Sequence, residues 1–258
     1  MQDVELESRN IQVEQTPVPA STSNTVDSEA VAGLVRSTGP AYVTLTVSEI
    51  QSDAVNISKE SRNVAPITSG SGFLVEGTGY VMTAAHVAVR KGNTVSARAA
   101  NGRVYTGTVV DVLPTNDMAL IKLRGFAGRS VTPAANACAP KGAVVFTLGK
   151  PHAQGDTARM GTVESMHFGR PVRYGSFGYP DAMVLRMGTQ KGESGGPVFN
   201  QSGQLVGMVV STLSDNSGNL LNLAHAVPAA NLAGFLCSHI ACSGNWSALA
   251  QTSTASCS

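Results

Sequence analysis

The stretch Lys191-Gly-Glu-Ser-Gly-Gly-Pro197 places a serine among glycines. Because glycine has no Cβ, the backbone can turn tightly here, and the amides of Gly192 and Ser194 can point at one spot. Two such donors form an oxyanion hole, which stabilises the negative charge that develops on a carbonyl oxygen under nucleophilic attack. The stretch therefore predicts that Ser194 is a nucleophile beside an oxyanion hole.

Two earlier segments supply the groups that such a serine needs. A serine hydroxyl is a weak nucleophile until a base removes its proton, and an imidazole, with an ordinary pKa near ~6.5, suits that task. His86 follows a predicted strand, and Asp117 precedes the apolar run 118–123, where a buried carboxylate can hold the imidazole in the correct tautomer. Taken singly, a histidine or aspartate in such a place is more often structural. The order His86, Asp117, Ser194, each beside a strand, carries the prediction.

Composition and patterning favour an all-β fold. Of the 258 residues, 42% are hydrophobic and 14% are charged, and 27 glycines and 12 prolines are spread along the chain, as suits short strands joined by turns. Runs rich in Val, Thr and Leu alternate with turn signals, which indicates a barrel or sandwich. The expected strands cover residues 43–47, 72–75, 80–83, 106–112, 118–123, 143–148, 157–166, 183–186, 205–210 and 224–227.

The chain divides into three parts by composition. Residues 1–27 are polar and rich in Ser, Thr and Pro, which predicts a disordered arm. Residues 28–242 form the folded domain, with two barrels that meet near 125–142, a helix that begins at Ser28 and ends at Gly39-Pro40, and a second helix over 231–240. Residues 243–258 are rich in Ser, Thr and Ala, and we expect a flexible tail.

Three blocks resemble the catalytic blocks of chymotrypsin-fold serine proteases, and most of all those of the HtrA/Deg type: Thr83-Ala-Ala-His86, Asn116-Asp-Met-Ala-Leu120 and Gly192-Glu-Ser-Gly-Gly-Pro197. The resemblance spans about residues 28–238. Further matching segments are Gly39-Pro-Ala-Tyr-Val43 after the short helix, Ser69-Gly-Ser-Gly-Phe-Leu-Val75, Leu148-Gly-Lys-Pro151 with Gly161-Thr-Val163, and Ala224-His-Ala-Val-Pro228.

This resemblance implies a double six-stranded β-barrel with short N- and C-terminal helices and an active site between the barrels. It also implies a serine endopeptidase that needs no cofactor, acts on protein or peptide substrates in quality control or processing, and forms homo-oligomers in some cases. His86 would be the general base, Asp117 its orienting acid and Ser194 the nucleophile, with the amides of Gly192 and Ser194 as the oxyanion hole. Two alternatives stay open: a binding or chaperone module with a latent triad, and a viral-type polyprotein-processing protease.

The sequence departs from the family at Glu193 and at its C-terminal end. HtrA-type members commonly have Asn before the nucleophile, and digestive trypsin-like enzymes have Asp, which pairs with a freshly cut N-terminus. We expect Glu193 to pair with a base such as Lys191 or Arg186, or to face solvent. HtrA relatives usually continue into a PDZ domain, whereas this sequence ends about thirty residues after Pro228, so it either lacks that domain or is a fragment.

By the family's pattern, the residue six before Ser194, Gly188, lies at the bottom of the primary specificity pocket. A glycine provides no carboxylate there to bind a Lys or Arg side chain, which predicts cleavage after small or medium apolar residues. Thr189 also resembles the threonine of glutamate-preferring and some viral proteases, and His225 would support an acidic preference, but the histidine of those enzymes corresponds to Val209. The expected pocket residues are Gly188, Thr189, Gln190, Val210, Ser211, Thr212, His225 and Ala226.

Four cysteines allow three pairings. In Cys237-Ser-His-Ile-Ala-Cys242, a short-loop disulfide or two free thiols is favoured over a metal site that includes His239, so no metal is expected. A bond between Cys138 and Cys257 would tether the tail. The even number of cysteines favours an oxidising, extracytoplasmic compartment, either periplasmic or secreted.

The charge pattern excludes some partners. The net charge is +1, with six acids and one base in residues 1–30, and no basic run exceeds Arg90-Lys91, so we expect no nucleic acid. No apolar stretch approaches the roughly 18 residues that cross a bilayer, so we expect no membrane span. No signal peptide is seen, because residues 1–7 carry acids where a signal peptide needs a basic segment and an apolar core.

Overall fold

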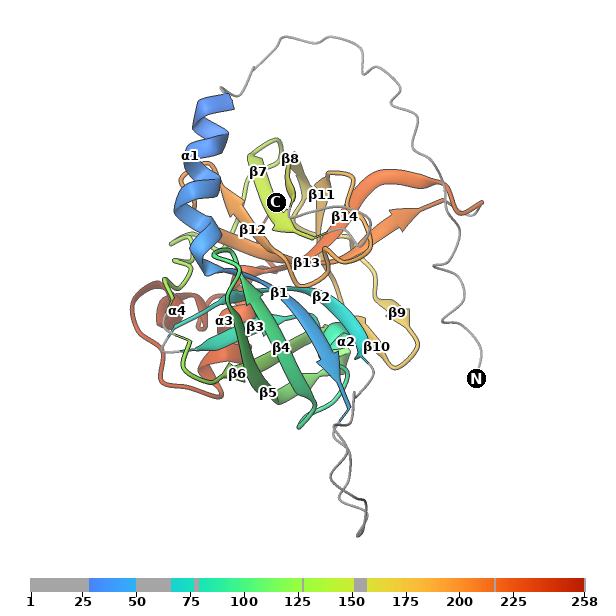
Figure 1. Cartoon of the computed structure of the whole chain (residues 1–258). Coiled ribbons are helices and arrows are strands. Elements are labelled where there is room, and N and C mark those ends of the chain that lie inside the picture. The colour runs from blue at the N-terminus through green and yellow to red at the C-terminus, as the bar shows by residue number, and fades with distance from the viewer. Residues whose placement is uncertain are drawn as a thin grey trace, which may run out of the picture.

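The computed structural model describes residues 28–49, 66–76, 79–126, 128–150, 157–215 and 217–257. The arm that we expect to be disordered, residues 1–27, lies outside this part of the chain. The described residues form two closed, six-stranded antiparallel barrels, stacked one above the other in Figure 1, with short helices at their ends. The prediction of an all-β double barrel is confirmed.

The first barrel has the strand order β1-β2-β3-β6-β5-β4, and pairing of β1 with β4 closes it. Alternation builds its strands: in β1, Val43, Leu45 and Val47 are fully buried, while the residues between them face outward. Helix α2 (Ala85–Ala88) follows β3, and the short 3-10 helix η3 (Pro114–Asn116) precedes β6. The strands are β1 (Tyr42–Ser48), β2 (Pro66–Leu74), β3 (Tyr80–Thr83), β4 (Thr94–Ala99), β5 (Val104–Leu113) and β6 (Met118–Leu123).

The second barrel has the order β11-β14-β13-β12-β7-β8, and pairing of β8 with β11 closes it. Residues 124–143 connect the two barrels. The rings of Phe146 of β7 and Phe199 of β12, with centroids 5.2 Å apart, belong to the same buried cluster as the core side chains of the first barrel, whereas Val145 and Val198 belong to the separate cluster of the second barrel. The strands are β7 (Val144–Gly149), β8 (Thr157–Ser165), β11 (Met183–Arg186), β12 (Pro197–Asn200), β13 (Leu205–Ser214) and β14 (Leu220–Pro228).

The sequence prediction omits four strands. In β4 the buried positions include Ala97 and Ala99, whose β-propensity is low, so the alternation carried little signal. Strand β12 has only four residues and begins at a proline directly after the glycine-rich stretch. Strands β9 (Val172–Tyr174) and β10 (Phe177–Tyr179) form a separate two-stranded hairpin where no strand is predicted.

The helices appear where the apolar spacing indicates them, and one more occurs in the C-terminal segment. Helix α1 (Ser28–Thr38) leads through η2 (Gly39–Ala41) into β1, and α3 (Ala229–Cys237) follows β14. The expected flexible tail, 243–258, is a wrong prediction for its described part: it forms α4 (Gly244–Leu249) and buries Trp246 and Leu249 in the core. Burial of a side chain the size of Leu249 contributes about 1.5–3 kcal/mol, which orders the segment.

Two disulfides stabilise the C-terminal part of the chain. Cys138 is bonded to Cys257, 119 residues later, and Cys237 is bonded to Cys242. Among the described residues no cysteine is free. In the same part of the chain, no helix is long and apolar enough to cross a membrane.

Candidate active site

His86 lies on α2, directly after β3 of the first barrel. Ala84 is extended, and the chain then turns into the single helical turn that carries the imidazole. The hydroxyl of Thr83, at the end of β3, donates to the carbonyl of Ser71 at 2.7 Å and ties this turn to β2. The His86 side chain is 26% exposed, so one edge of the ring faces the protein and the other stays accessible.

Asp117 lies opposite His86, between η3 and β6, and is completely buried. Its backbone has a φ of +48°, a left-handed conformation that aspartate tolerates better than most residues. Nδ1 of His86 lies 2.9 Å from Oδ2 and 3.1 Å from Oδ1 of Asp117, and the backbone amide of His86 donates to Oδ1 at 3.0 Å. Because an ionised carboxylate only accepts hydrogen bonds, Nδ1 carries the proton and Nε2 is left as the acceptor on the opposite edge.

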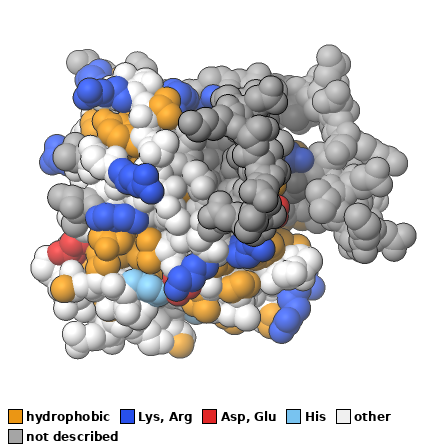
Figure 2. Space-filling view, turned by 60° about the horizontal axis from the view of Figure 1, so that its bottom comes forward, with side chains coloured by type: hydrophobic (Ala, Val, Ile, Leu, Met, Phe, Trp, Pro, Cys, Tyr) orange, Lys and Arg blue, Asp and Glu red, His pale blue; other side chains and the backbone are white. Residues whose placement is uncertain are grey.

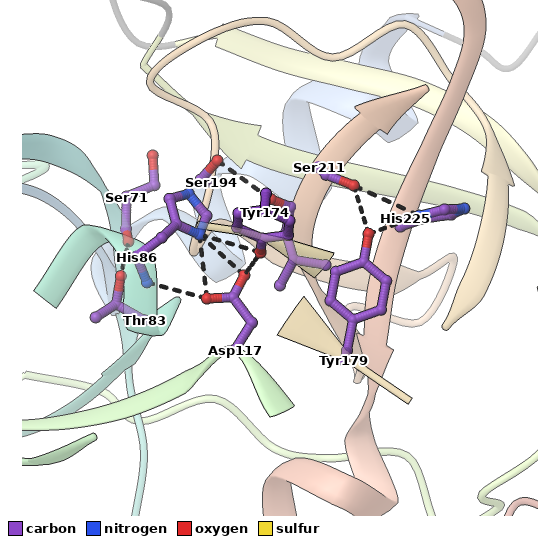
Figure 3. A network of polar contacts seen from close by, with 10 residues as sticks. Ser71, Thr83, His86, Asp117, Tyr174, Tyr179, Ser194, Ser211 and His225 are labelled. Carbon is purple, nitrogen blue, oxygen red and sulfur yellow. Dashed lines mark hydrogen bonds and ion pairs between the residues drawn. The ribbon is translucent and has the colours of Figure 1, made fainter. Parts of the chain in front are cut away.

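Ser194 comes from the second barrel and meets this pair at the junction of the barrels (Figure 3). Its carbonyl accepts a hydrogen bond from the amide of Ser71 at 2.8 Å. The next residue, Gly195, has a φ of +82°, and a Cβ there would overlap the carbonyl of Ser71 and the hydroxyl of Thr83, so only glycine fits. This close approach is what the glycine-rich stretch permits.

The hydroxyl of Ser194 is turned toward β13. It lies 3.5 Å from the carbonyl of Val210, at the outer limit of a hydrogen bond, and within the described chain no hydrogen bond joins it to His86. In Figure 3 the imidazole nevertheless lies between Asp117 and Ser194. The structure thus brings the three predicted residues together, with the hydroxyl in a rotamer that does not engage the base.

The two predicted oxyanion donors lie on the loop that ends at Ser194. Gly192 has a φ of +97°, which favours glycine, and its carbonyl accepts a hydrogen bond from the Ser71 hydroxyl at 2.9 Å. Among the hydrogen bonds of the described residues, neither the Gly192 amide nor the Ser194 amide is a donor. Both N–H groups therefore remain available to a ligand oxygen.

Glu193 is fully buried and pairs with Arg159 of β8, 34 residues earlier. Nε of Arg159 lies 2.6 Å from Oε1 of Glu193, and the backbone amide of Gln190 donates to Oε2 of Glu193. Glu193 thus pairs with a base, but that base is neither Lys191 nor Arg186, and the carboxylate does not face solvent; Arg186 instead binds Glu164 at 2.7 Å. Burial raises the pKa of Glu193, while Arg159 and the Gln190 amide act in the opposite direction. The Glu193 carboxylate thus links the loop before Ser194 to β8 through Arg159, and it binds the loop itself through the backbone amide of Gln190.

Tyr174 is a residue that the sequence prediction missed. It lies on β9, in the hairpin with β10, and its hydroxyl donates a hydrogen bond to Oδ2 of Asp117. Its ring meets the His86 imidazole edge-on, with centroids 5.6 Å apart and planes at 80°. The signal that could have found the hairpin is the dipeptide Gly175-Ser176, because two-residue turns that begin with glycine join antiparallel strands.

The predicted pocket residues divide into two groups. Gly188, Thr189 and Gln190 lie on the loop before Ser194, and the hydroxyls of Thr189 and Thr212 are 2.6 Å apart, so these side chains meet across the predicted pocket. A Cβ at Gly188 would overlap the amide oxygen of Asn222 on β14.

Val210 and the second group, Ser211, His225 and Ala226, lie on β13 and β14. Ser211 and His225 form a buried network with Tyr179 of β10, whose hydroxyl lies 2.7 Å from both Ser211 Oγ and His225 Nδ1 (Figure 3). Burial lowers the pKa of His225 to about 4, so the ring is neutral at pH 7. Ala226 is fully buried in the core of the second barrel.

The segment around Cys237 and Cys242 holds no metal-type cluster within the described residues. His239, the possible third metal ligand, instead binds Asp111 at 2.7 Å, and among the described residues no three His, Cys, Asp or Glu side chains gather as a metal site would need. A hollow of about 530 Å³ beside His167 and Asp181 contains none of the predicted catalytic residues. On the face shown in Figure 2, Lys and Arg side chains are spread among hydrophobic and uncharged ones.

Known proteins resemble this chain in sequence and in fold. The family model of the trypsin-like peptidase domain matches residues 70–208, just over half of the chain. A probable periplasmic serine endoprotease, DegP-like, of Bartonella henselae is 28% identical over 173 residues, which cover 67% of this chain and 33% of that protein. The mitochondrial serine protease HTRA2 of Bos taurus is 29% identical over 211 residues, which cover 80% of this chain and 42% of that protein. The chain thus spans less than half the length of these relatives.

Solved structures share the fold. The active form of the Rv3671c protease from M. tuberculosis has a TM-score of 0.65 at 23% identity and covers 92% of this chain and 96% of its own. The HtrA-type protease AlgW with a tripeptide has a TM-score of 0.59 at 22% identity and covers 76% of this chain and 59% of its own.

Proposed function

The chain belongs to the trypsin-like peptidase family, and on this basis we propose that it is a serine endopeptidase that hydrolyses peptide bonds through an acyl-enzyme on Ser194. The observation that carries this proposal is the His86–Asp117 pair beside Ser194. The carboxylate fixes the imidazole with Nδ1 inward at 2.9 Å, so Nε2 is presented as a base on the side where Ser194 lies.

In the first half of the reaction, Ser194 Oγ attacks the carbonyl carbon of the scissile peptide while His86 Nε2 takes the hydroxyl proton. The oxygen of the tetrahedral intermediate accepts hydrogen bonds from the amides of Gly192 and Ser194, and Asp117 stabilises the imidazolium. When the C–N bond breaks, the leaving amine takes the proton from His86, and the acyl group stays on Ser194. A water molecule, deprotonated by His86, then attacks the ester, releases the new carboxylate and restores the serine.

The oxyanion loop needs no activation cleavage in this proposal. Arg159 supplies, from within the folded barrel, the cation that Glu193 requires, and the Gln190 amide binds the other carboxylate oxygen. Because this ion pair is internal to the second barrel, the amides of Gly192 and Ser194 can be oriented as soon as the barrel folds.

For the primary specificity pocket, we propose a preference for small or medium apolar side chains. Gly188 provides no charge, and the hydroxyls of Thr189 and Thr212 bond to each other. His225, neutral at pH 7 and bound to Tyr179, offers no positive charge to an acidic side chain. A peptide library varied at the residue before the cleaved bond tests this: Ala and Val should exceed Glu and Arg, and a Glu preference would refute it.

We also propose protein substrates and an extracytoplasmic location. The two disulfides support an oxidising compartment. Among the relatives, the DegP-like protein is described as periplasmic and HTRA2 as mitochondrial. Homo-oligomerisation stays a prediction, and light scattering of the purified chain would measure its oligomeric state directly.

Unfolded casein tests the proposed activity. The native protein should cut it into fragments, and Ser194→Ala should reduce kcat by about a millionfold, because the nucleophile is lost. Ser202→Ala, in an exposed turn, serves as the matched control and should cleave like the native protein. Undiminished cleavage by Ser194→Ala would refute the assignment.

One observation favours a second candidate function. The Ser194 hydroxyl contacts the Val210 carbonyl rather than His86, which suits a binding or chaperone module with a latent triad. That candidate predicts intact casein in a stable complex on gel filtration, where the endopeptidase predicts fragments.

A further inference from the structure

The β9–β10 hairpin joins the two halves of the site. It leaves the second barrel between β8 and β11 and reaches the first barrel, where β10 packs on η3, the segment directly before Asp117. In Figure 1 the hairpin extends beside α2. Tyr174 and Phe177 face each other across its two-residue turn, and both rings meet His86 edge-on, at centroid distances of 5.6 and 6.5 Å.

The hydroxyl of Tyr174 fills the last hydrogen-bonding position of a buried carboxylate. Oδ1 of Asp117 accepts from the backbone amide of His86, and both carboxylate oxygens lie within reach of Nδ1. Oδ2 receives its other hydrogen bond from Tyr174, whose oxygen also lies 3.5 Å from Nδ1 (Figure 3). A completely buried carboxylate is costly unless its acceptors are satisfied, so this donor belongs to the support of the site.

The phenol can act only as a donor toward Asp117. Burial, together with the negative charge of Asp117, raises the pKa of Tyr174 far above its ordinary value, so the hydroxyl keeps its proton. The titratable groups that face this hydroxyl are His86 of α2, Asp117 before β6 and Tyr179 of β10. None of them is a permanent cation, so the Tyr174 donor takes the place of a positive charge beside the carboxylate.

We propose that Tyr174 is a positioning residue for proton transfer: its hydrogen bond to Oδ2 holds the Asp117 carboxylate in the orientation that keeps His86 Nδ1 bound and Nε2 directed at Ser194. The same bond moderates the negative charge that the carboxylate presents to the imidazolium. The kinetic part of this inference rests on the proposed endopeptidase function, but the hydrogen bond itself can be measured without catalysis.

Tyr174→Phe removes the hydroxyl and keeps the ring against His86. We expect kcat to fall about tenfold with little change in KM, as for the loss of one hydrogen bond that orients a catalytic group. Because the carboxylate would then present more unshared charge to the imidazolium, the acid limb of the pH profile of kcat/KM should move to higher pH. The proton between His86 Nδ1 and Asp117 should move downfield in the NMR spectrum.

Tyr179→Phe is the matched control, because it removes a buried hydroxyl from the same hairpin that binds Ser211 and His225 instead of Asp117. Its acid limb and its Nδ1 proton should stay where they are in the native protein. The same shifts in both variants would show a general effect of the hairpin and overturn the proposal, as would unchanged values in Tyr174→Phe.

Replacing Tyr174 by 3-fluorotyrosine provides a second variant that keeps the ring and the hydroxyl, should the phenylalanine variant fail to fold. Its hydroxyl is a stronger donor, so the acid limb should move to lower pH and the Nδ1 proton upfield, opposite to Tyr174→Phe. A shift in the same direction as Tyr174→Phe, or none, would refute the proposal. If the protein hydrolyses no substrate, the proposed function fails, and the NMR shifts still decide the role of Tyr174.

Discussion

The two barrels place their reactive groups by different means. In the first barrel, β3 and β6 are neighbours, with Thr83 paired to Ala119, so the end of β3 and the start of β6 meet at one edge. His86 and Asp117 follow directly from this register. In the second barrel, Ser194 lies on the loop between β11 and β12, which are not neighbours in the sheet.

This difference shows why the second barrel needs more side-chain support. Strand pairing cannot fix a loop that crosses between separated strands, and here the buried Glu193–Arg159 pair and the Gln190 amide hold it. The pair His86–Asp117, by contrast, is fixed by backbone register and then refined by Tyr174. Changes in the first barrel should therefore alter chemistry with little loss of stability, whereas changes under the loop should alter both.

The largest expected effect tests the first barrel. Asp117→Asn keeps the shape of the side chain but presents an amide to Nδ1, which favours the wrong imidazole tautomer. We expect kcat to fall about ten-thousandfold, as it does when the triad aspartate of other Ser-His-Asp proteases is replaced by asparagine. The urea midpoint should change little. Steady-state kinetics measure kcat, and urea unfolding measures the midpoint. A decrease in kcat of less than tenfold would contradict the role assigned to Asp117.

Next in size, Arg159→Met leaves the Glu193 carboxylate buried without its cation. Breaking such a pair costs about 3–5 kcal/mol of unfolding free energy, and activity should fall with the loosened oxyanion loop. Burial already raises the pKa of Glu193, and the variant loses the partner that opposes this shift. The folded state then binds a proton more readily than the unfolded state, so the loss of stability should shrink as pH falls from 7.5 to 5.

The double variant Arg159→Met/Glu193→Gln is the control for this prediction. It removes both charges and should recover most of the stability, because an unpaired buried charge, rather than the missing pair, is the main cost. Equal stability of the single and double variants in urea at pH 7.5 would contradict the unpaired charge as the main cost, and native stability of Arg159→Met would show that the ion pair does not support the loop.

A third prediction concerns the two disulfides. Cys138–Cys257 closes 119 residues, and its loss through Cys138→Ser should lower the unfolding free energy by about 2–5 kcal/mol. Cys237–Cys242 closes a loop of only five residues, so Cys237→Ser should cost less on the chain-entropy account. Thermal unfolding of both variants gives the ranking, and a reversed order would contradict it.

The smallest expected effect is the pH dependence of stability that His225 of the second barrel causes. His225 is 2% exposed and its pKa is lowered to about 4, so between pH 6.5 and 4 the unfolded state binds more protons than the folded state. The free energy of unfolding should therefore decrease as the pH is lowered through this window, by up to about 3 kcal/mol from this residue.

His167 acts in the opposite direction, because its hydrogen bond to Asp181 raises its pKa. The difference between the native protein and His225→Gln isolates the His225 contribution. The unfolding free energy of His225→Gln should decrease less on acidification than that of the native protein. Equal decreases in the two proteins, measured by urea unfolding from pH 7 to 4, would refute the prediction.

The double barrel and the approximate place of its reactive residues could be predicted because they depend on local signals. The glycines around Ser194 and the apolar strands beside His86 and Asp117 are contiguous in the sequence. The Glu193 partner could not be found in this way. Nearby Arg186 binds Glu164 across the β8–β11 pair, and Arg159 comes close to Glu193 because β8 lies beside β7, which in turn pairs with β12.

Tyr174 and the C-terminal segment were missed for a similar reason. A three-residue strand has no measurable period, so the β9–β10 hairpin had only its Gly175-Ser176 turn as a signal. Trp246 and Leu249 show the i, i+3 spacing of a helix, but a Ser/Thr/Ala-rich composition masked it. In both places, packing against a distant element decides the structure.

Active-site labelling with a fluorophosphonate, followed by mass spectrometry of the labelled peptide, tests the joint action of the two barrels most directly. The native protein should carry one adduct, on Ser194, formed by attack of its hydroxyl on phosphorus with loss of fluoride, and His86→Ala should slow the labelling by several orders of magnitude. An adduct on a different residue, or equal labelling rates in the native protein and His86→Ala, would contradict the account.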